Sequence, residues 1–324
     1  MYSPPFEITN KMVNLVSEIS DKTRAFSDFQ GLEKRPHLRR INRLRSIHSS
    51  LAIEANSLSF NQVQDVIDGK SVMGSAKEIE EVKRAYAAYD EIDSYNPYSI
   101  KDLNRAHSLL IENGGNFRKC GEGVFDGDRC IFMAPSEKLV PELMGNLFTW
   151  MKNSADDVHP LILSSVFHYE FVFIHPYEDG NGRMARLWQN VILSNWNPIF
   201  RYMPIENQIH ESQQEYYDVI SRCHVSGTDT EFIEFLLEMI DKTLTKMLNT
   251  KESYPSKYVV KLLTLMEEGV PYTPVQLQSS LNLKSRDALR DSYLRPALDD
   301  GYIEYEIPDK PKSKNQRYIK RREF

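Results

Sequence analysis

The pattern of apolar and polar positions predicts one helix after another over the first half of the chain. From Ile8 to about Ser154, apolar residues recur at spacings of three and four, with charged positions between them. The repeat is clearest at Ile41, Leu44, Ile47, Leu51 and Ile53. Turn and stop residues divide the predicted helices at Pro36, 56–59, Gly69, Asn96-Pro97 and Gly114-Gly115.

Residues 117–134 interrupt this helical pattern. Glycines at positions 121, 123 and 127 separate short β-prone pieces, the last of which is Arg129–Met133. The segment therefore predicts a β-hairpin that forms a flap. A plain covering loop is the alternative.

Helical spacing returns after the flap, and the chain then ends in a differently patterned tail. Further helices are predicted over about Ser136–Asn153, Pro160–Ile174, Asn181–Asn195, Glu206–His224 and Thr230–Asn249. After a linker at residues 251–256, helices over 257–268, 273–281 and 285–300 precede strands at 302–307 and 316–320. Three short helices followed by a β-ribbon are typical of the winged-helix arrangement of the helix-turn-helix group. The predicted fold class is mainly α, with a helical region at 1–95, a core at 96–250 and a winged helix at 255–324.

The composition is that of a globular protein. Of the 324 residues, 41% are hydrophobic and 27% are charged. The longest apolar runs are shorter than the roughly 20 residues that a bilayer requires, and the N-terminus does not resemble a secretion signal. The three cysteines are too few and too scattered for a disulfide framework, so we expect a cytoplasmic protein without a membrane partner.

The charge is unevenly distributed along the chain. The net charge is −6, which argues against a protein dedicated to wrapping nucleic acid. Residues 255–324 carry 13 Lys+Arg against 10 Asp+Glu, whereas the rest carries 27 against 36. The tail is thus basic and the body is acidic.

The candidate chemistry lies in the run His175-Pro-Tyr-Glu-Asp-Gly-Asn-Gly-Arg-Met-Ala-Arg186. Gly180, Asn181 and Gly182 stand where a helix should begin, and backbone N–H groups at a helix N-terminus attract anions. Arg183 and Arg186 are three residues apart, so they project from one helix face toward the same polyphosphate. Asp179 supplies an oxygen ligand for Mg²⁺, and His175 could take a proton from an attacking hydroxyl. Together these residues predict a site for phosphoryl or nucleotidyl transfer.

Simpler interpretations fit this run less well. Asp-Gly-Asn-Gly could be a hairpin turn, but its helical flanks disfavour that. An EF-hand loop would need an oxygen ligand at Arg183 and a glycine at Met184, and no P-loop motif occurs in the chain. Taken alone, His175 would be read as a structural histidine.

The run resembles the signature of the Fic family, His-Pro-Phe-x-Asp/Glu-Gly-Asn-Gly-Arg-x-x-Arg, with Tyr177 in place of Phe. The resemblance implies a general base at His175, a metal ligand at Asp179, and phosphate binding by the residues Gly180, Asn181, Gly182, Arg183 and Arg186. It also implies a β flap that registers the target segment. Glycine at position 182 resembles the AMP-transferring members, whereas relatives that act as kinases have lysine there.

A second resemblance lies upstream, in Ser50-Leu-Ala-Ile-Glu54-Ala-Asn56. It is similar to the inhibitory helix motif of the family, with Ala55 in place of the usual Gly or Asn, and it places the inhibitory helix at about 40–56. A carboxylate of Glu54 against Arg186 would occupy the cation that should receive the γ-phosphate. An ordinary solvated charge is the alternative for Glu54 alone.

The two resemblances imply a protein adenylyltransferase that moves AMP from Mg²⁺-bound ATP to a Ser, Thr or Tyr hydroxyl and is autoinhibited by Glu54 and Ser50. The target protein would dock on the 117–134 flap; self-modification and a homodimer are left open. The alternatives are removal of AMP at the same site, or a winged-helix DNA-binding regulator whose helical body senses nucleotide.

The basic residues of the tail could contact a phosphate backbone. They are Arg286, Arg290, Arg295, Lys310, Lys312, Lys314, Arg317, Lys320, Arg321 and Arg322. Acidic residues at 287, 291, 299 and 300 weaken that surface, so a protein-interaction role for the tail also stands. Cys120 and Cys130 are expected to be packing residues rather than metal ligands.

Overall fold

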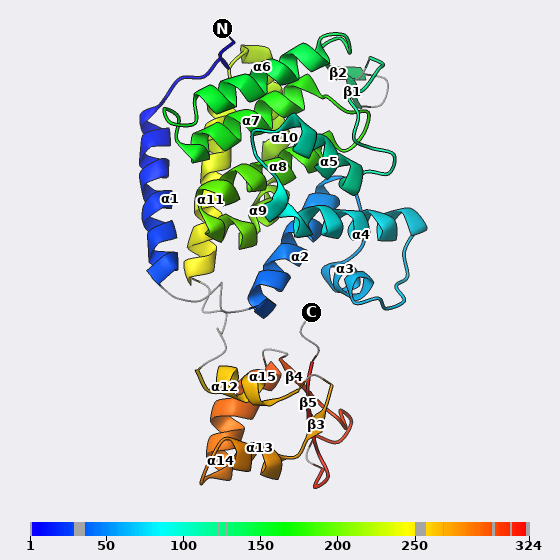
Figure 1. Cartoon of the computed structure of the whole chain (residues 1–324), viewed down its shortest axis with the longest axis vertical. Coiled ribbons are helices and arrows are strands. Elements are labelled where there is room, and N and C mark those ends of the chain that lie inside the picture. The colour runs from blue at the N-terminus through cyan, green and yellow to red at the C-terminus, as the bar shows by residue number, and fades with distance from the viewer. Residues whose placement is uncertain are drawn as a thin grey trace. The chain divides into compact units, whose positions relative to one another are not determined.

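The computed structural model describes residues 2–28, 36–121, 123–126, 129–249, 257–267, 269–299, 302–311 and 313–321. They form a mainly helical protein, as predicted, with one two-stranded and one three-stranded sheet (Figure 1). The chain divides into two compact units, residues 1–246 and 247–324. The predicted helical region 1–95 and nearly all of the predicted core 96–250 lie in the first unit.

Eleven α-helices are described in the chain up to residue 249. They are α1 (Asn10–Asp28), α2 (Pro36–Ile53), α3 (Phe60–Ile67), α4 (Ala76–Asp90), α5 (Ile100–Leu110), α6 (Val140–Asn153), α7 (Pro160–Ile174), α8 (Asn181–Trp196), α9 (Ile205–Glu211), α10 (Gln213–Ser226) and α11 (Thr230–Asn249). Short 3-10 turns, η1 (Ile92–Ser94) and η2 (Pro198–Tyr202), follow α4 and α8. Reciprocal capping boxes at Ser59–Gln62 and Ser75–Glu78 explain where α3 and α4 begin.

Helices α7 and α8 pack against each other in the middle of the first unit (Figure 1). Most side chains of both helices are buried, so neither helix has a broad solvent face. A helix that is apolar on all sides belongs in a core, and α7 fits this rule except for a few buried polar residues. Because the chain passes directly from α7 through a short loop into α8, residues 175–180 are held between two largely buried helices.

The predicted flap is a hairpin of β1 (Gly123–Asp126) and β2 (Arg129–Met133) at the edge of the first unit (Figure 1). The strands are antiparallel, and the pairing Gly123↔Met133 shifts register between Val124 and Phe125. Such a bulge increases local twist and turns the edge of a short ribbon. The predicted β-hairpin is therefore confirmed.

One predicted helix is divided. The segment Glu206–His224 was expected to be a single helix, but it forms α9 and α10, with a break at Ser212. Ser212 has φ −113° and ψ 28°, outside the helical region, and its N–H donates to Gln208 and Ile209. No Gly or Pro marks this position, so the sequence carries no stop signal there.

The second unit contains the predicted helices and ribbon, together with a strand that was not predicted. Its elements are α12 (Lys257–Leu265), β3 (Pro271–Tyr272), α13 (Pro274–Ser280), α14 (Arg286–Ala288), the π-helical turn η3 (Leu289–Leu294), α15 (Arg295–Asp299), β4 (Ile303–Tyr305) and β5 (Tyr318–Lys320). Strand β3 pairs with β5 to complete an antiparallel sheet in the order β3-β5-β4. Leu262, Leu277 and Leu294 belong to a separate core for this unit. The winged-helix assignment stays a prediction.

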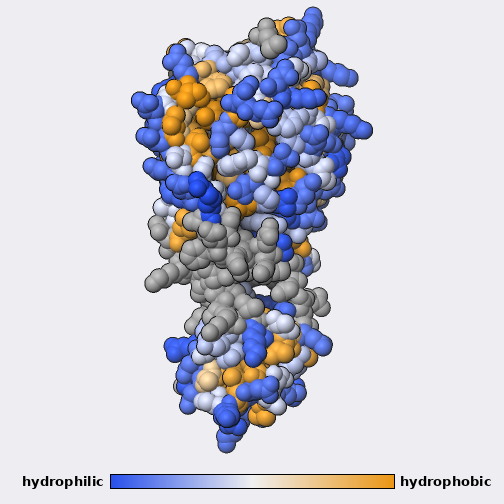
Figure 2. Space-filling view, turned by 60° about the vertical axis from the view of Figure 1, so that its left-hand side comes forward, coloured by the Kyte–Doolittle hydropathy of each residue, from blue (hydrophilic) through white to orange (hydrophobic). Residues whose placement is uncertain are grey.

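No helix in the described part of the chain is both long and apolar enough to cross a bilayer. Figure 2 shows hydrophilic residues over much of the visible surface, with apolar residues between them on both units.

Two buried carboxyl groups meet beside the N-terminal segment. Glu170 of α7 and Asp229, just before α11, are almost inaccessible to solvent, and Tyr2 donates a hydrogen bond from its hydroxyl to Glu170. Burial, followed by the charge of Glu170, raises the pKa of Asp229 far above its usual range. The folded protein therefore keeps a proton on this pair that the unfolded chain releases.

This pair predicts a loss of stability with rising pH. An acid whose pKa is raised on folding binds more protons in the folded state, so the free energy of unfolding falls as pH increases above about 4. In Asp229→Asn a neutral amide replaces the acid, so the buried position stays uncharged at every pH. We expect this variant to exceed the wild type in unfolding free energy by about 1 kcal/mol or more at about pH 8, and by less at about pH 5.

Urea unfolding at the two pH values measures the effect. The matched control is Asp157→Asn, because Asp157 is exposed in the turn after α6. An Asp229→Asn advantage that does not grow with pH would contradict the shared proton.

Candidate functional site

The candidate site is built around the loop that joins α7 to α8. Helix α7 ends at Ile174, and its C-cap residue His175 adopts φ 51° and ψ 60° and is only partly buried. His175 Nδ1 lies 3.2 Å from the Val172 carbonyl oxygen. Because a carbonyl oxygen only accepts hydrogen bonds, this contact assigns the ring hydrogen to Nδ1. In the neutral ring Nε2 is then the basic nitrogen, which is the arrangement that proton abstraction requires.

Tyr177 anchors the loop in the core. Its side chain is fully buried, and its hydroxyl donates to Asn104 Oδ1 at 2.6 Å, so the position tolerates Tyr in place of Phe. The ring stacks on His107 with a centroid distance of 3.6 Å and an interplanar angle of 7°. Asn181 closes the loop: its amide donates to the Tyr177 carbonyl at 2.8 Å and accepts from the Tyr177 N–H at 3.0 Å. The Asn181 side chain thus shapes the loop from within.

His107 supports the same loop through hydrogen bonds of its ring. Its Nδ1 accepts a hydrogen bond from the Gly115 N–H at 2.8 Å, which leaves Nε2 to donate to the Asp179 carbonyl at 2.9 Å. Burial lowers the pKa of His107, which keeps the ring neutral in this role. Gly180 follows with φ 78°, and a Cβ there would come within 2.6 Å of Ile111, so glycine is required on both grounds.

Asp179 is the carboxylate at the mouth of the loop. Its side chain is 65% exposed, and its oxygens accept hydrogen bonds from the Gly180 N–H at 2.6 Å and from Arg183 Nη2 at 2.9 Å. Burial raises the pKa of Asp179, but the charge of Arg183 and these hydrogen bonds outweigh it, so the pKa lies below its usual range. The group is therefore an exposed carboxylate at neutral pH.

Two buried arginines line the first turns of α8. Arg183 is 6% exposed and Arg186 is 2% exposed. Among the described residues, Nε of Arg183 and Nη1 of Arg186 have no hydrogen-bond acceptor. Gly180 is the N-cap of α8, and no side chain caps the helix there. Buried guanidinium donors without acceptors, beside an uncapped helix N-terminus, form a site that fits an anion.

Ser50 and Glu54 extend from the end of α2 to Arg186. Arg186 donates to the Ser50 hydroxyl and carbonyl at 3.0 Å each, and to Glu54 Oε1 at 2.7 Å. A Cβ at Gly182 would lie 2.4 Å from Glu54 Oε1, so the carboxylate rests directly over the backbone of the first turn of α8. Burial lowers the pKa of Arg186, but Glu54 outweighs it and raises the pKa, so the guanidinium stays charged.

A neutral hydrogen-bond chain lies next to Arg186 on α7, α8 and α10. His168 donates from Nδ1 to Gln189 Oε1 at 2.8 Å and accepts at Nε2 from the Tyr216 hydroxyl at 3.0 Å. Burial lowers the pKa of His168 to about 3. Because this ring carries no charge at neutral pH, it neither repels the guanidinium nor competes for its anion.

Sequence reasoning missed His107, Asn104 and Arg118, which hold the loop without belonging to the motif. The Arg118 guanidinium donates to the His175 carbonyl at 2.7 Å, and the residue is 3% exposed. Asn104 and His107 lie in helix α5, which precedes the flap, and Arg118 lies at the start of the 117–134 segment. Their spacing in sequence does not reveal which carbonyl or ring they reach.

The cysteine prediction is corrected at Cys120. This residue is exposed, and its Sγ lies 3.8 Å from Glu178 Oε1, so it is not a packing residue. The side chain of Cys130 lies outside the described residues. No cluster of three or more His, Cys, Asp or Glu side chains that could hold a metal occurs among the residues that were described.

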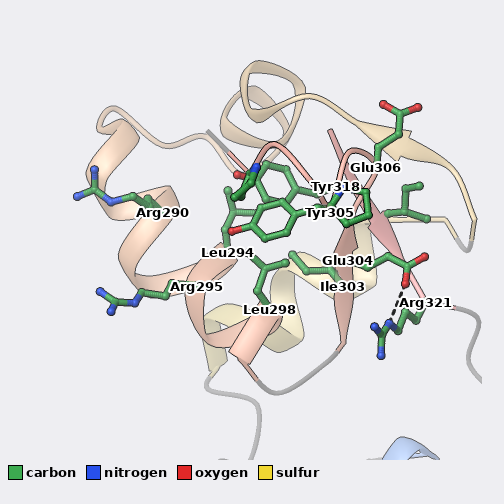
Figure 3. Close-up of a pocket in the computed structure, with 13 residues that line it drawn as sticks. Arg290, Leu294, Arg295, Leu298, Ile303, Glu304, Tyr305, Glu306, Tyr318 and Arg321 are labelled. Atoms are coloured by element: carbon green, nitrogen blue, oxygen red, sulfur yellow. Dashed lines mark hydrogen bonds and ion pairs between the residues drawn. The ribbon is translucent and has the colours of Figure 1, made fainter. Parts of the chain in front are cut away.

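The second unit carries a pocket of about 1030 Å³ between η3–α15 and the β4–β5 ribbon (Figure 3). Leu294, Leu298, Tyr305 and Tyr318 face its centre, whereas Arg290 and Arg295 point away from the ribbon. Several of the basic residues expected to contact a phosphate backbone are already paired: Arg290 with Asp287 and Asp291, Arg317 with Glu306, and Arg321 with Glu304. Lys312 and Arg322 lie outside the described residues.

Comparison with known proteins identifies the family. A solved Fic family protein from Desulfovibrio desulfuricans G20 is 40% identical, covers 98% of both chains and superposes with a TM-score of 0.73. The chain belongs to the Fic/DOC family. The Fic/DOC family model matches residues 97–193, and the model for the C-terminal domain of Fic-like proteins (filamentation induced by cAMP) matches residues 257–319.

Other Fic proteins are more distant. The protein adenylyltransferase Fic of Aedes aegypti is 26% identical over 285 residues, which are 82% of this chain and 52% of the relative. The chain thus spans about half the length of the curated relatives that it matches. Fic-1 (aa134–508) from C. elegans is 21% identical, with 75% of this chain and 73% of that chain covered and a TM-score of 0.61, so it supports the fold alone.

Ala55 is the one strained residue at the end of α2. The N–H groups of Ala55 and Asn56 donate to the carbonyls of Ala52 and Leu51, which is the pattern of a Schellman motif with Glu54 at the C-cap. Ala55 adopts φ 65°, the left-handed conformation that glycine occupies most easily. The departure from the family motif at this position therefore costs backbone strain.

Replacing Ala55 with Gly should stabilise this Fic protein by about 0.5–1 kcal/mol, because it removes the left-handed strain. Urea unfolding of the wild type and Ala55→Gly measures the difference. Ala52→Gly, one turn earlier in α2, is the matched control and should destabilise by about 1 kcal/mol. A destabilised Ala55→Gly would show that the Schellman ending does not form.

Proposed function

We propose that this Fic protein is a protein adenylyltransferase: it transfers AMP from ATP to a Ser, Thr or Tyr hydroxyl of a protein, which can be the enzyme itself. The observation that carries the proposal is the pair of buried arginines with donors that lack acceptors, at the uncapped N-terminus of α8. This site fits a polyphosphate. The names of relatives such as the Aedes aegypti protein support the same reaction.

In the proposed reaction, the target hydroxyl loses its proton to Nε2 of His175. Its oxygen bonds to the α-phosphorus of ATP, and the bond from that phosphorus to the bridging oxygen breaks, so pyrophosphate leaves. Gly180, Gly182 and the first-turn N–H groups would position the phosphates, while Arg183 and Arg186 would offset charge that accumulates on them. The Asn181 side chain would act by keeping the loop in shape.

Magnesium fits this site through Asp179. Mg²⁺ is usually bound by one or two carboxylates together with substrate phosphates and water, and Asp179 offers one exposed carboxylate. When bound there, the ion would neutralise phosphate charge. To serve as a ligand, Asp179 needs to share its oxygens with Arg183, which now binds both of them.

Glu54 would act as an inhibitor by competing for Arg186. The carboxylate already supplies Arg186 with an anion and covers Gly182, where an outer phosphate would lie. ATP can then bind productively only if Glu54 withdraws. The Glu54 side chain is 37% exposed, so it can leave the site without unpacking the core.

Hydrolysis that removes AMP from a modified protein, and so reverses the modification, is a second candidate at the same site. Because Glu54 is partly exposed above the loop, its carboxylate could orient a water molecule toward AMP on a modified protein. The two reactions would share His175 and differ in whether Glu54 occupies its present position.

Labelled ATP tests the proposal. Glu54→Gly should raise label transfer to protein at least about tenfold over the wild type, since it frees Arg186. His175→Ala in the Glu54→Gly background should lower transfer at least about 100-fold, because general-base catalysis contributes that much or more. Removal of Mg²⁺ with a chelator should abolish transfer.

Two controls make the test specific. Glu91→Gly changes a glutamate at the C-cap of another helix, α4, and should leave transfer unchanged. Glu54→Gln keeps the shape of the side chain but removes its charge, so it should release part of the inhibition. No transfer by Glu54→Gly, or equal transfer after His175→Ala, would refute the proposal; wild-type release of AMP from labelled protein would favour the reverse reaction.

A further inference from the structure

Arg118 connects three segments of the first unit through their backbone. Its guanidinium donates from Nε to the His175 carbonyl at 2.7 Å and from Nη1 to the Cys120 carbonyl at 2.8 Å. Nη2 donates to the Pro135 carbonyl and, at 3.4 Å, to the Ile174 carbonyl. The acceptors come from the end of α7, the segment before β1 and the segment after β2.

The contacts with Ile174 and His175 cap α7. The last carbonyl groups of a helix lack partners within it and carry partial negative charge, so a cation there is favourable. The main chain of Arg118 adds a further bond, from its N–H to the Pro176 carbonyl at 2.9 Å. His175 holds a left-handed conformation that costs a non-glycine residue about 1 kcal/mol or more, and these bonds fix the peptide groups on both sides of that strain.

The contacts with Cys120 and Pro135 hold the two ends of the hairpin. The described backbone of the hairpin is paired by a short antiparallel ladder, and an isolated two-stranded hairpin is marginally stable. The guanidinium that caps α7 thus also closes the base of the flap. Lysine could not replace it, because a single ammonium group lacks the planar fork that reaches carbonyls in three directions.

We infer that Arg118 is a positioning residue that holds His175 and the 117–134 flap in one register. Given the proposed function, a target segment paired with the flap would then present its hydroxyl at a fixed place relative to Nε2 of His175. Arg118 contacts neither ATP nor the target in this scheme, because its donors point to backbone carbonyls. Its effect on the reaction would come from geometry alone.

Kinetics in the Glu54→Gly background separate positioning from nucleotide binding. In Arg118→Ala and Arg118→Lys, kcat for AMP transfer should fall at least about tenfold, since misplacement of reacting groups by about 1 Å can cost far more. KM for ATP should change less than about threefold, because Arg183, Arg186 and the loop amides remain. Guanidinium ion, at concentrations that leave the fold intact, should restore part of the activity of Arg118→Ala but not of Arg118→Lys.

Hydrogen exchange provides a readout that does not depend on the reaction. In the otherwise wild-type protein without nucleotide, Arg118→Ala should speed exchange of the β1–β2 ladder amides at least about tenfold and shift the ring resonances of His175. The control Arg105→Ala removes an arginine of α5 that pairs with Glu91 and should change neither.

The outcomes distinguish the two proposals. If Glu54→Gly transfers no AMP, the proposed function fails, while exchange and the His175 resonances still decide the role of Arg118. Unchanged exchange and resonances in Arg118→Ala would overturn the inference. So would full activity in Arg118→Lys, or a rise in KM for ATP that matches the loss in kcat.

Discussion

The site depends on one buried guanidinium that has to be given an anion. Arg186 is enclosed by α2, α8 and the residues packed beneath them, and a buried charge without a counter-charge is costly. Glu54 supplies that anion here, together with the Ser50 hydroxyl and carbonyl. A phosphate that replaced Glu54 would pair with the same buried guanidinium, whose charge and place are already set by the fold. The ion pair between Glu54 and Arg186 therefore both stabilises the α2–α8 contact and blocks the proposed nucleotide site.

The surrounding structure keeps this guanidinium charged and fixed in direction. The ring of His168 is neutral, so it adds no positive charge beside Arg186. Glu206 accepts hydrogen bonds from Tyr89 and Asn190, and burial raises its pKa, which favours its neutral form over a second carboxylate beside Glu54. The Schellman ending of α2 determines where the carboxylate stands, and Gly182 leaves room for it. Small changes in any of these groups alter the position of one carboxylate.

Much of this arrangement could be predicted from the sequence, because it resides in local patterns. The bounds of Pro160–Ile174 and Thr230–Asn249, the flap, and the positions of His175 through Arg186 follow from spacing and turn residues. The contact between Glu54 and Arg186 was expected from the two motifs together. The break at Ser212 and the strand Pro271–Tyr272 were not, because packing sets the first and pairing with a distant strand sets the second. Arg118 was missed for a similar reason: its partners are carbonyl groups, which every residue possesses and no sequence pattern marks.

That last property has an evolutionary consequence. Arg118 holds the ribbon through backbone carbonyl groups, so its hydrogen bonds do not depend on which side chains the ribbon carries. If a target docks on the flap as proposed, substitutions in the ribbon sequence can change the surface offered to it while the flanking chain stays anchored at Cys120 and Pro135. Target preference can then change without altering the contact between Arg118 and His175.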